Sequence, residues 1–244
     1  LEDWSSSGEY GHGFLLLPIA VYLAWRTRER DPRPARGWGT AMIAGGVVLF
    51  LAGTLAAEFF TRRSAVLLVL AGLALHYRGW LQLRAWWLPF GLLAFTVPLP
   101  EVVLNSLTLP LQLLASRLAV ALLEFRHVPA GLSGNIILLP GQELFVAEAC
   151  SGLRSLSALL GLTLLIGGTA LQTGWSRVAL LLFAVPAALA ANALRVFGTG
   201  FAAHYLGPGV TEGFLHEVAG ALVFLLPLGL VGLITLLLRR AEKR

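Results

Sequence analysis

The sequence predicts an all-α polytopic membrane protein with about seven transmembrane helices and one small β-hairpin outside the bilayer. Of the 244 residues, 57% are hydrophobic and 13% are charged, whereas roughly 25% of the residues in a soluble domain are charged. Apolar segments separated by short charged or Gly/Pro-containing loops run along the chain, and a helix needs about 20 apolar residues to cross a bilayer. These observations exclude a soluble globular fold and indicate one integral-membrane domain over residues 1–244.

Seven apolar segments are expected to cross the membrane, with limits set by charged residues and by Gly/Pro turns. If the native N-terminus is cytoplasmic, one further helix is expected before residue 1, which gives about eight spans. The seven segments are residues 13–25, 38–57, 64–77, 81–98, 151–171, 178–198 and 217–238.

The orientation follows from two basic segments, residues 26–36 and 239–244, which are expected in the cytoplasm. An even number of spans must then separate them, and six result when residues 101–126 are left out. We therefore expect residues 101–126 to lie along the outer membrane surface as an amphipathic or re-entrant helix. Residues 128–147 contain a Pro-Gly turn between two short β-prone runs, which predicts a small hairpin. Together, residues 101–147 form an extracytoplasmic insertion.

Composition and motifs also limit the partners. The net charge of +5 does not indicate nucleic-acid binding, because the cations cluster in short loops and at the C-terminus. No P-loop, dinucleotide fingerprint or metal-ligand spacing is present, and Gly220 stands where HExxH would require its second histidine. We therefore expect the lipid bilayer as a partner, and no nucleic acid, cofactor or metal.

Three residues with reactive or ionisable side chains lie near the outer ends of predicted spans. Cys150, the only cysteine, begins the 151–171 segment, Arg195 lies near the outer end of 178–198, and His216 begins the last span. Each alone has an ordinary structural explanation, because a lone Cys is often a small buried hydrophobe and an Arg near a helix end often reaches toward the interface. Ionisable residues at membrane depth are costly, however, so their joint placement on one side predicts a functional site.

Acyl transfer is the chemistry that these three residue types can perform together. A thiol attacks as a thiolate, which a nearby cation favours. A histidine can accept the thiol proton and deliver it to the leaving amine, while an arginine, which stays charged, can stabilise the oxyanion. Cys150, Arg195 and His216 are therefore the predicted catalytic residues. Asn192, three residues before Arg195 on the same helical face, is expected to orient it.

The sequence resembles the exosortase/archaeosortase family of membrane transpeptidases over nearly its whole length. The matching stretches are "EYGHGFLLLPIAVYLAWR", "VPLP", "VAEACSGLRSL", "ANALRV" and "HEVAG". The resemblance implies that Cys150, Arg195 and His216 correspond to the catalytic Cys, Arg and His of the family. It also implies about eight spans and a location in the cell inner membrane. The predicted orientation puts the active site on the periplasmic side.

The implied activity is cleavage of a C-terminal sorting signal on exported proteins, which consists of a Pro-Glu-Pro-type motif, a membrane helix and a basic tail. A thioester on Cys150 would then pass to an acceptor molecule that the sequence does not identify. His12 belongs to the resemblance and could line the substrate entrance or be structural. His204 is the rival of His216 for the acid/base role, and His216 is preferred because it opens the last span and matches the family block.

Two other functions compete with this enzyme. A membrane transporter or polysaccharide-export permease could use Arg195 and His216 as a proton or anion site, and a non-catalytic scaffold would need none of these residues. The placement of the polar residues toward one face, together with a nucleophile, favours the enzyme. Replacement of Cys150 by Ala separates the possibilities, since it would abolish acyl transfer and scarcely disturb a permease.

Overall fold

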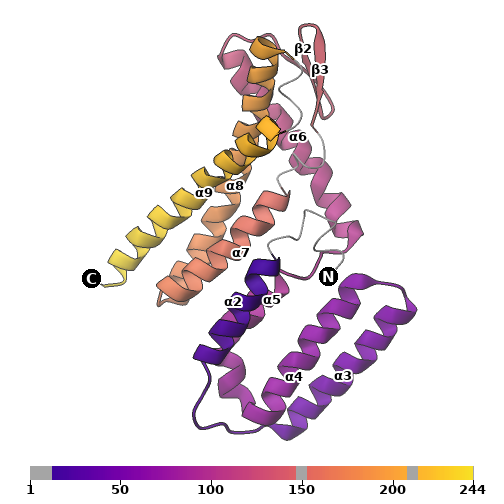
Figure 1. Cartoon of the computed structure of the whole chain (residues 1–244), viewed down its shortest axis with the longest axis vertical. Helices are drawn as coiled ribbons and strands as arrows, with labels where there is room; N and C mark the ends of the chain where they lie inside the picture. Colours follow the sequence, from indigo (N-terminus) through magenta and orange to yellow (C-terminus); the bar gives the residue numbers. More distant parts are fainter. Residues whose placement is uncertain (1–12, 147–152, 208–213, 244) are drawn as a thin grey trace. The chain divides into compact units, whose positions relative to one another are not determined.

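The computed structural model describes residues 13–146, 153–207 and 214–243 as a set of helices with one small sheet (Figure 1). The chain divides into two compact units, Leu1–Glu101 and Val102–Arg244. The mostly helical architecture confirms the predicted all-α class. Each unit has its own packing and is described in turn.

The N-terminal unit contains α2 (Gly13–Arg26), α3 (Arg36–Leu55), α4 (Phe59–Ala85) and α5 (Trp87–Ala94). Helix α3 packs along α4, and α2 packs against α5. The buried residues of α3 are glycines at a spacing of seven, which lets the two backbones approach closely, as small residues do in membrane helix pairs. These glycines are Gly39, Gly46 and Gly53.

Helix α4 begins and breaks at identifiable residues. The Glu58 carboxylate accepts hydrogen bonds from the backbone N–H groups of Phe60 and Thr61 and so caps the helix. Hydrogen bonds from the Thr61 hydroxyl and backbone lower the pKa of Glu58. At Gly79 the backbone leaves the helical region with φ of 83°, and a Cβ there would lie 1.7 Å from the carbonyl oxygen of Arg33. Only glycine fits this break.

The buried side chain of Gln82 holds the basic loop between α2 and α3 in place. Its Nε2 donates to the carbonyl oxygen of Thr27 over 3.2 Å, and its Oε1 accepts from the backbone N–H of Glu29 over 2.9 Å. Arg78 donates to the carbonyl oxygen of Glu29. The loop backbone is therefore fixed, while the arginine side chains of residues 26, 28, 30, 33 and 36 are exposed.

The C-terminal unit contains α6 (Glu101–Phe125), three strands, α7 (Leu153–Ala170), α8 (Gly174–Leu206) and α9 (Phe214–Ala241). The strands β1 (Gly131–Ser133), β2 (Ile136–Leu139) and β3 (Gln142–Phe145) form an antiparallel sheet in that order. The predicted Pro-Gly turn is present, with φ of 80° at Gly141.

The prediction of a two-stranded hairpin was incomplete, because the sheet has a third strand. A turn at Gly134, with φ of 62°, pairs Ser133 with Ile136 and adds β1 to the sheet. At three residues, β1 is too short to give a clear alternation of apolar and polar positions, which explains why the sequence did not reveal it.

Helix α8 is shared by two apolar clusters. Its N-terminal half packs with α7 and α9 around Leu159, Leu180 and Val231. Its C-terminal part packs with α6 and the sheet around Leu123, Ile137 and the α8 residue Val196. At 33 residues, α8 is about 50 Å long, whereas the hydrocarbon core of a bilayer is about 30 Å thick.

Polar contacts tie α9 to the start of α8. The Glu242 carboxylate, directly after α9, accepts hydrogen bonds from the backbone N–H groups of Gln172 and Thr173 and from the Thr173 hydroxyl, over 2.9, 3.0 and 2.7 Å. The Arg177 guanidinium donates to the carbonyl oxygen of Leu171, the residue directly after α7. The Glu242 contacts fix the position of α9 along α8.

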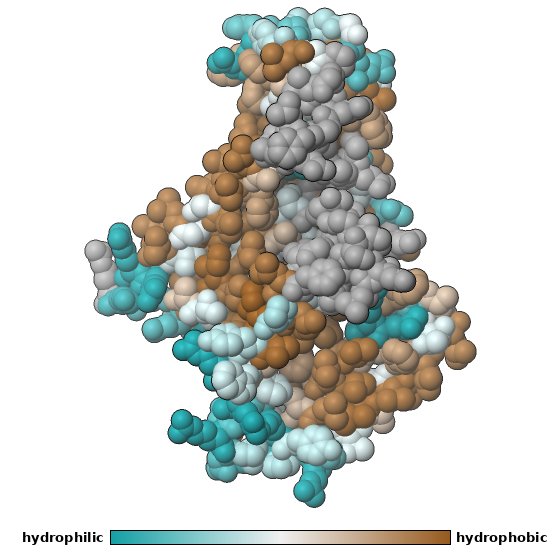
Figure 2. Space-filling model, viewed as in Figure 1, coloured by the Kyte–Doolittle hydropathy of each residue, from teal (hydrophilic) through white to brown (hydrophobic). Residues whose placement is uncertain are grey.

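Five helices among the described residues are long and apolar enough to cross a membrane, namely α3, α4, α6, α8 and α9. Helices α2 and α7 are apolar but shorter. Apolar side chains cover the exposed flanks of α3 and α9, and hydrophilic ones gather at the C-terminal end of α9 (Figure 2). This pattern supports a multi-pass membrane protein, but the predicted count of seven spans is not confirmed.

Two predicted spans differ from the helices that the structure contains. The predicted spans at residues 64–77 and 81–98 lie on either side of the break at Gly79, and the second one is interrupted again at Trp86 and ends at Ala94. The segment 101–126 is one continuous helix that is long enough to cross. Its expected position along the outer surface stays a prediction.

Replacement of Gln82 by Leu is expected to lower the free energy of unfolding by about 1 kcal/mol, because it removes the buried amide that pairs with the carbonyl of Thr27 and the N–H of Glu29. Thermal unfolding of the purified protein in detergent measures the effect. The same substitution at exposed Gln172 is the control and should leave the melting temperature unchanged. Equal melting temperatures for Gln82→Leu and wild type would contradict the loop-clamping role.

The position of α6 is tested by labelling single cysteines in a Cys150→Ala background. If α6 lies along the outer surface, exposed cysteines at Leu99 and Ser133, on either side of it, will both react with a membrane-impermeant maleimide in intact spheroplasts. A cysteine at Arg30, in the basic loop, is the internal control and should be protected. Labelling at only one of the two flanking positions would show that α6 crosses the membrane.

Candidate active site

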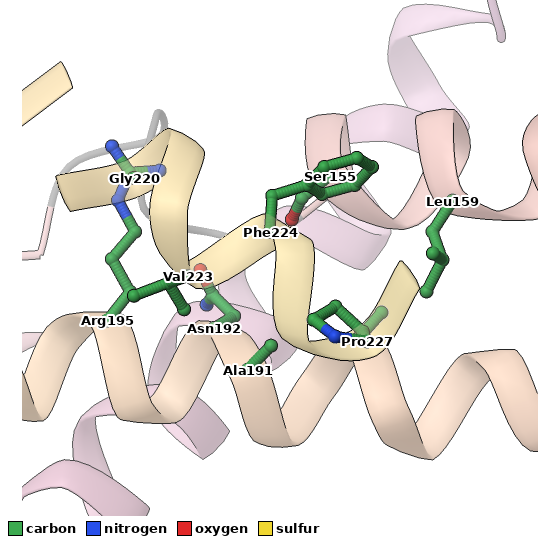
Figure 3. A pocket seen from close by; sticks show the side chains of 10 residues that line it. Ser155, Leu159, Ala191, Asn192, Arg195, Gly220, Val223, Phe224 and Pro227 are labelled. Atoms are coloured by element: carbon green, nitrogen blue, oxygen red, sulfur yellow. The ribbon is translucent and has the colours of Figure 1, made fainter. Parts of the chain in front are cut away.

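A crevice lies where α7, α8 and α9 meet in the C-terminal unit (Figure 3). Helix α7 contributes Ser155 from its first turn, α8 contributes Asn192 and Arg195, and α9 contributes Gly220 and Phe224. On α8 the crevice begins at Ala188, which also belongs to the cluster with α7 and α9, and ends at Arg195, just before Val196 of the cluster with the sheet. The polar side chains are therefore concentrated at the junction of the two cores.

The Arg195 side chain extends from α8 to the backbone of α9 at Gly220 (Figure 3). A Cβ atom on Gly220 would lie 2.9 Å from both Cζ and one terminal nitrogen of the Arg195 guanidinium. The Arg195 residue is half-buried, and its Nε atom is shielded from solvent. A charged group held in such surroundings interacts more strongly with nearby charge than one in water does.

Asn192 is buried beside Arg195 on the same helix. It is only 5% exposed and lines the same crevice, which agrees with the predicted common face of α8. A buried amide of this kind is normally fully engaged in hydrogen bonds. The structure thus bears out the shared face, whereas the orienting role of Asn192 stays a prediction.

The side chains of the other two predicted catalytic residues are not described by the structure. Cys150 lies outside the described residues, three positions before α7 begins at Leu153. His216 lies in the first turn of α9, four residues or about one helical turn before Gly220. The crevice therefore joins the beginning of α7, the beginning of α9 and Arg195.

His204, the alternative acid/base residue, does not lie in the crevice. His204 is nine residues after Arg195 on α8, which puts it on the opposite face of the helix, and it does not line the crevice. Its ring contacts Tyr205 edge-on instead. This geometry disfavours His204 as the acid/base residue. His12 lies outside the described residues.

A metal centre finds no support in the described part of the chain. No group of three or more His, Cys, Asp or Glu residues there could hold a metal ion. The polar lining of the crevice instead offers a guanidinium, an amide and a hydroxyl, which are hydrogen-bond donors suited to a developing negative charge.

The sequence model of the transmembrane exosortase family matches residues 4–233, nearly the whole chain. The chain belongs to the transmembrane exosortase family. Neither the curated proteins nor the solved structures gave a significant match. Membership of this family implies a membrane transpeptidase, and the predicted resemblance to exosortases is thereby confirmed.

Several crevice residues of this exosortase, among them Ser155 and Gly220, were not recognised as part of the site from the sequence. Ser155 follows Cys150 by five residues, and Gly220 follows His216 by four, inside the matching stretch "HEVAG". The helical spacing of four between 216 and 220 was a usable signal for a shared face. Nothing in the sequence, however, showed that an arginine from another helix would contact Gly220.

Replacement of Asn192 by Ala is expected to reduce substrate processing by about tenfold, because loss of the buried amide loosens the surroundings of Arg195 one turn away. The rate of product formation in membranes from cells with matched protein levels measures it. The exposed Asn105, replaced in the same way, is the control. Wild-type rates for Asn192→Ala would exclude an orienting role.

Proposed function

We propose that this exosortase is a membrane-embedded cysteine protease/transpeptidase that cleaves a C-terminal sorting signal of exported proteins through a thioester on Cys150. The observation that carries the proposal is the crevice in which the beginnings of α7 and α9 meet the Arg195 guanidinium. Cys150 precedes α7 by three residues and His216 lies in the first turn of α9, so both are attached to the crevice by short lengths of chain.

The chemistry assigns one role to each residue. The Cys150 thiol transfers its proton to the His216 imidazole, and the resulting thiolate attacks the carbonyl carbon of the scissile peptide bond. The Arg195 guanidinium stabilises the oxyanion that forms. Collapse of this intermediate breaks the C–N bond, with His216 returning the proton to the leaving amine, and leaves a thioester on Cys150. Attack on the thioester by an amine acceptor or by water then frees the thiol.

The lengths of α8 and α9 support an active site on the periplasmic side. Twenty-two residues separate Thr173 from Arg195 on α8, and the same number separates Gly220 from Glu242 on α9. Twenty-two residues of helix span about 33 Å, close to the roughly 30 Å of the hydrocarbon core. The crevice and the basic C-terminal end of α9 are thus one membrane thickness apart, and a cytoplasmic basic end leaves the crevice outside.

This location fits a substrate whose signal ends in a membrane helix and a basic tail. Such a tail stays in the cytoplasm by the same rule that orients the enzyme, so the motif preceding the helix emerges at the level of the crevice. We infer a Pro-Glu-Pro-type motif as the cleaved sequence, exported proteins as partners, the inner membrane as the location, and an acceptor whose nucleophile resolves the thioester.

Co-expression with a tagged substrate that carries the motif, a membrane helix and a basic tail tests the proposal. Loss of the tail is expected with wild type and not with Cys150→Ala, and an adduct that hydroxylamine releases is expected for a thioester. Equal processing by wild type and Cys150→Ala would remove Cys150 as the nucleophile. An exosortase that leaves this substrate intact, and instead conducts protons or anions in vesicles, would establish the permease alternative.

The acid/base assignment is tested by a matched pair of histidine variants in the same assay. His216→Ala should block processing, because the leaving amine then receives no proton. His204→Ala should retain it, since His204 lies on the opposite face of α8 from Arg195.

A further inference from the structure

We propose that Gly220 is a positioning residue of this exosortase: its bare backbone forms the surface on which the Arg195 guanidinium rests. This inference rests on the proposed function, in which Arg195 stabilises the oxyanion. It adds to that function a residue whose own side chain has no chemistry, and it gives a reason for glycine at this position.

The contact is closer than any side chain at position 220 would allow. A Cβ on Gly220 would lie 2.9 Å from Cζ, 2.9 Å from a terminal nitrogen and 3.1 Å from Nε of Arg195. Ordinary van der Waals contacts of a Cβ fall at 3.4–4 Å. The three nearest atoms all belong to the guanidinium, so this group, rather than the backbone of α8, would have to move.

Position 220 needs glycine for space and not for backbone conformation. Gly220 lies within helix α9 and is not among the described glycines with positive φ. Alanine can therefore adopt the backbone conformation at position 220, and it has a higher helix propensity than glycine. A Gly220→Ala protein should consequently fold, and only the guanidinium should be displaced.

Other glycines of α9 show that this close contact is specific to position 220. Cβ atoms on Gly229 and Gly232 would meet nothing within 4 Å. The same change at Gly229 therefore alters the helix propensity of α9 in the same way but leaves Arg195 untouched. Gly229→Ala is the matched control.

The contact between Gly220 and Arg195 also sets the position of the proposed oxyanion donor, Arg195, relative to the helix that carries the proposed acid/base residue, His216. Gly220 lies one helical turn after His216 on α9, so the guanidinium resting there has its position fixed relative to the helix that carries His216. Oxyanion donors act over 2.7–3.1 Å, and a misplacement of about 1 Å can cost about 100-fold in rate. A shift of the guanidinium by several tenths of an ångström should therefore reduce kcat by about tenfold or more.

The test compares purified wild type, Gly220→Ala and Gly229→Ala in nanodiscs, with a peptide substrate that spans the cleavage motif. We expect Gly220→Ala to lower kcat at least tenfold with KM changed less than twofold, and Gly229→Ala to stay within twofold of wild type in both constants. The melting temperature of Gly220→Ala should equal or exceed that of wild type. An unchanged kcat, or a loss of kcat that follows a fall in melting temperature, would overturn the proposal.

A double-mutant cycle with Arg195→Lys separates positioning from a general packing role. The lysine ammonium is compact and lacks the planar guanidinium that Gly220 accommodates. In the Arg195→Lys background, Gly220→Ala should therefore change the residual kcat by less than twofold. An equal loss in both backgrounds would mean that Gly220 acts independently of Arg195.

A second measurement does not depend on activity and distinguishes failure of this inference from failure of the proposed function. Phenylglyoxal modification of Arg195, followed by mass spectrometry, should be faster in Gly220→Ala than in wild type or Gly229→Ala, because the displaced guanidinium becomes accessible. Identical labelling in all three would overturn the positioning role. If Gly220→Ala labels faster than wild type but the Cys150→Ala variant keeps full activity, the proposed function is rejected and the positioning role of Gly220 stands.

Discussion

The antiparallel pairing of α8 with α9 is the constraint on which the candidate site depends. At one end the Glu242 carboxylate binds the N–H groups that precede α8, and at the other the Arg195 guanidinium rests against Gly220. The same number of residues separates the two contacts on α8 and on α9, so both contacts are made in one register of the helix pair. A slip of α9 by one turn, about 5.4 Å, would break the first contact and move Gly220 away from Arg195.

The length of α8 explains why this exosortase places a polar crevice between two apolar cores. A helix of about 50 Å exceeds the hydrocarbon thickness, so its two ends have different surroundings. The N-terminal half packs on α7 and α9, while the C-terminal part packs on α6 and the sheet. The side chains of Asn192 and Arg195 lie where one core ends and the other begins, and a crevice there provides polar donors without cutting through either core.

The sequence predicted those features that depend on local pattern. The apolar segments at residues 13–25, 38–57, 151–171, 178–198 and 217–238 all correspond to helices, since each carries a long apolar pattern. The third strand and the interruption at Trp86 were missed, because a three-residue strand and a single helix break leave too weak a pattern. The loop clamp by Gln82 was also invisible, since its partners are backbone groups of Thr27 and Glu29, more than 50 positions away.

The sequence by itself determined that this is a helical membrane protein of the exosortase family and named Cys150, Arg195 and His216 as its candidate catalytic residues, because composition, periodicity and motif spacing are local properties. Only the tertiary structure decided which helix faces meet. It joined the beginnings of α7 and α9 at Arg195 and left His204 on the other face of α8. It also gave Gly220 a role, since contact between an arginine and a distant backbone arises only when two helices pack in one register.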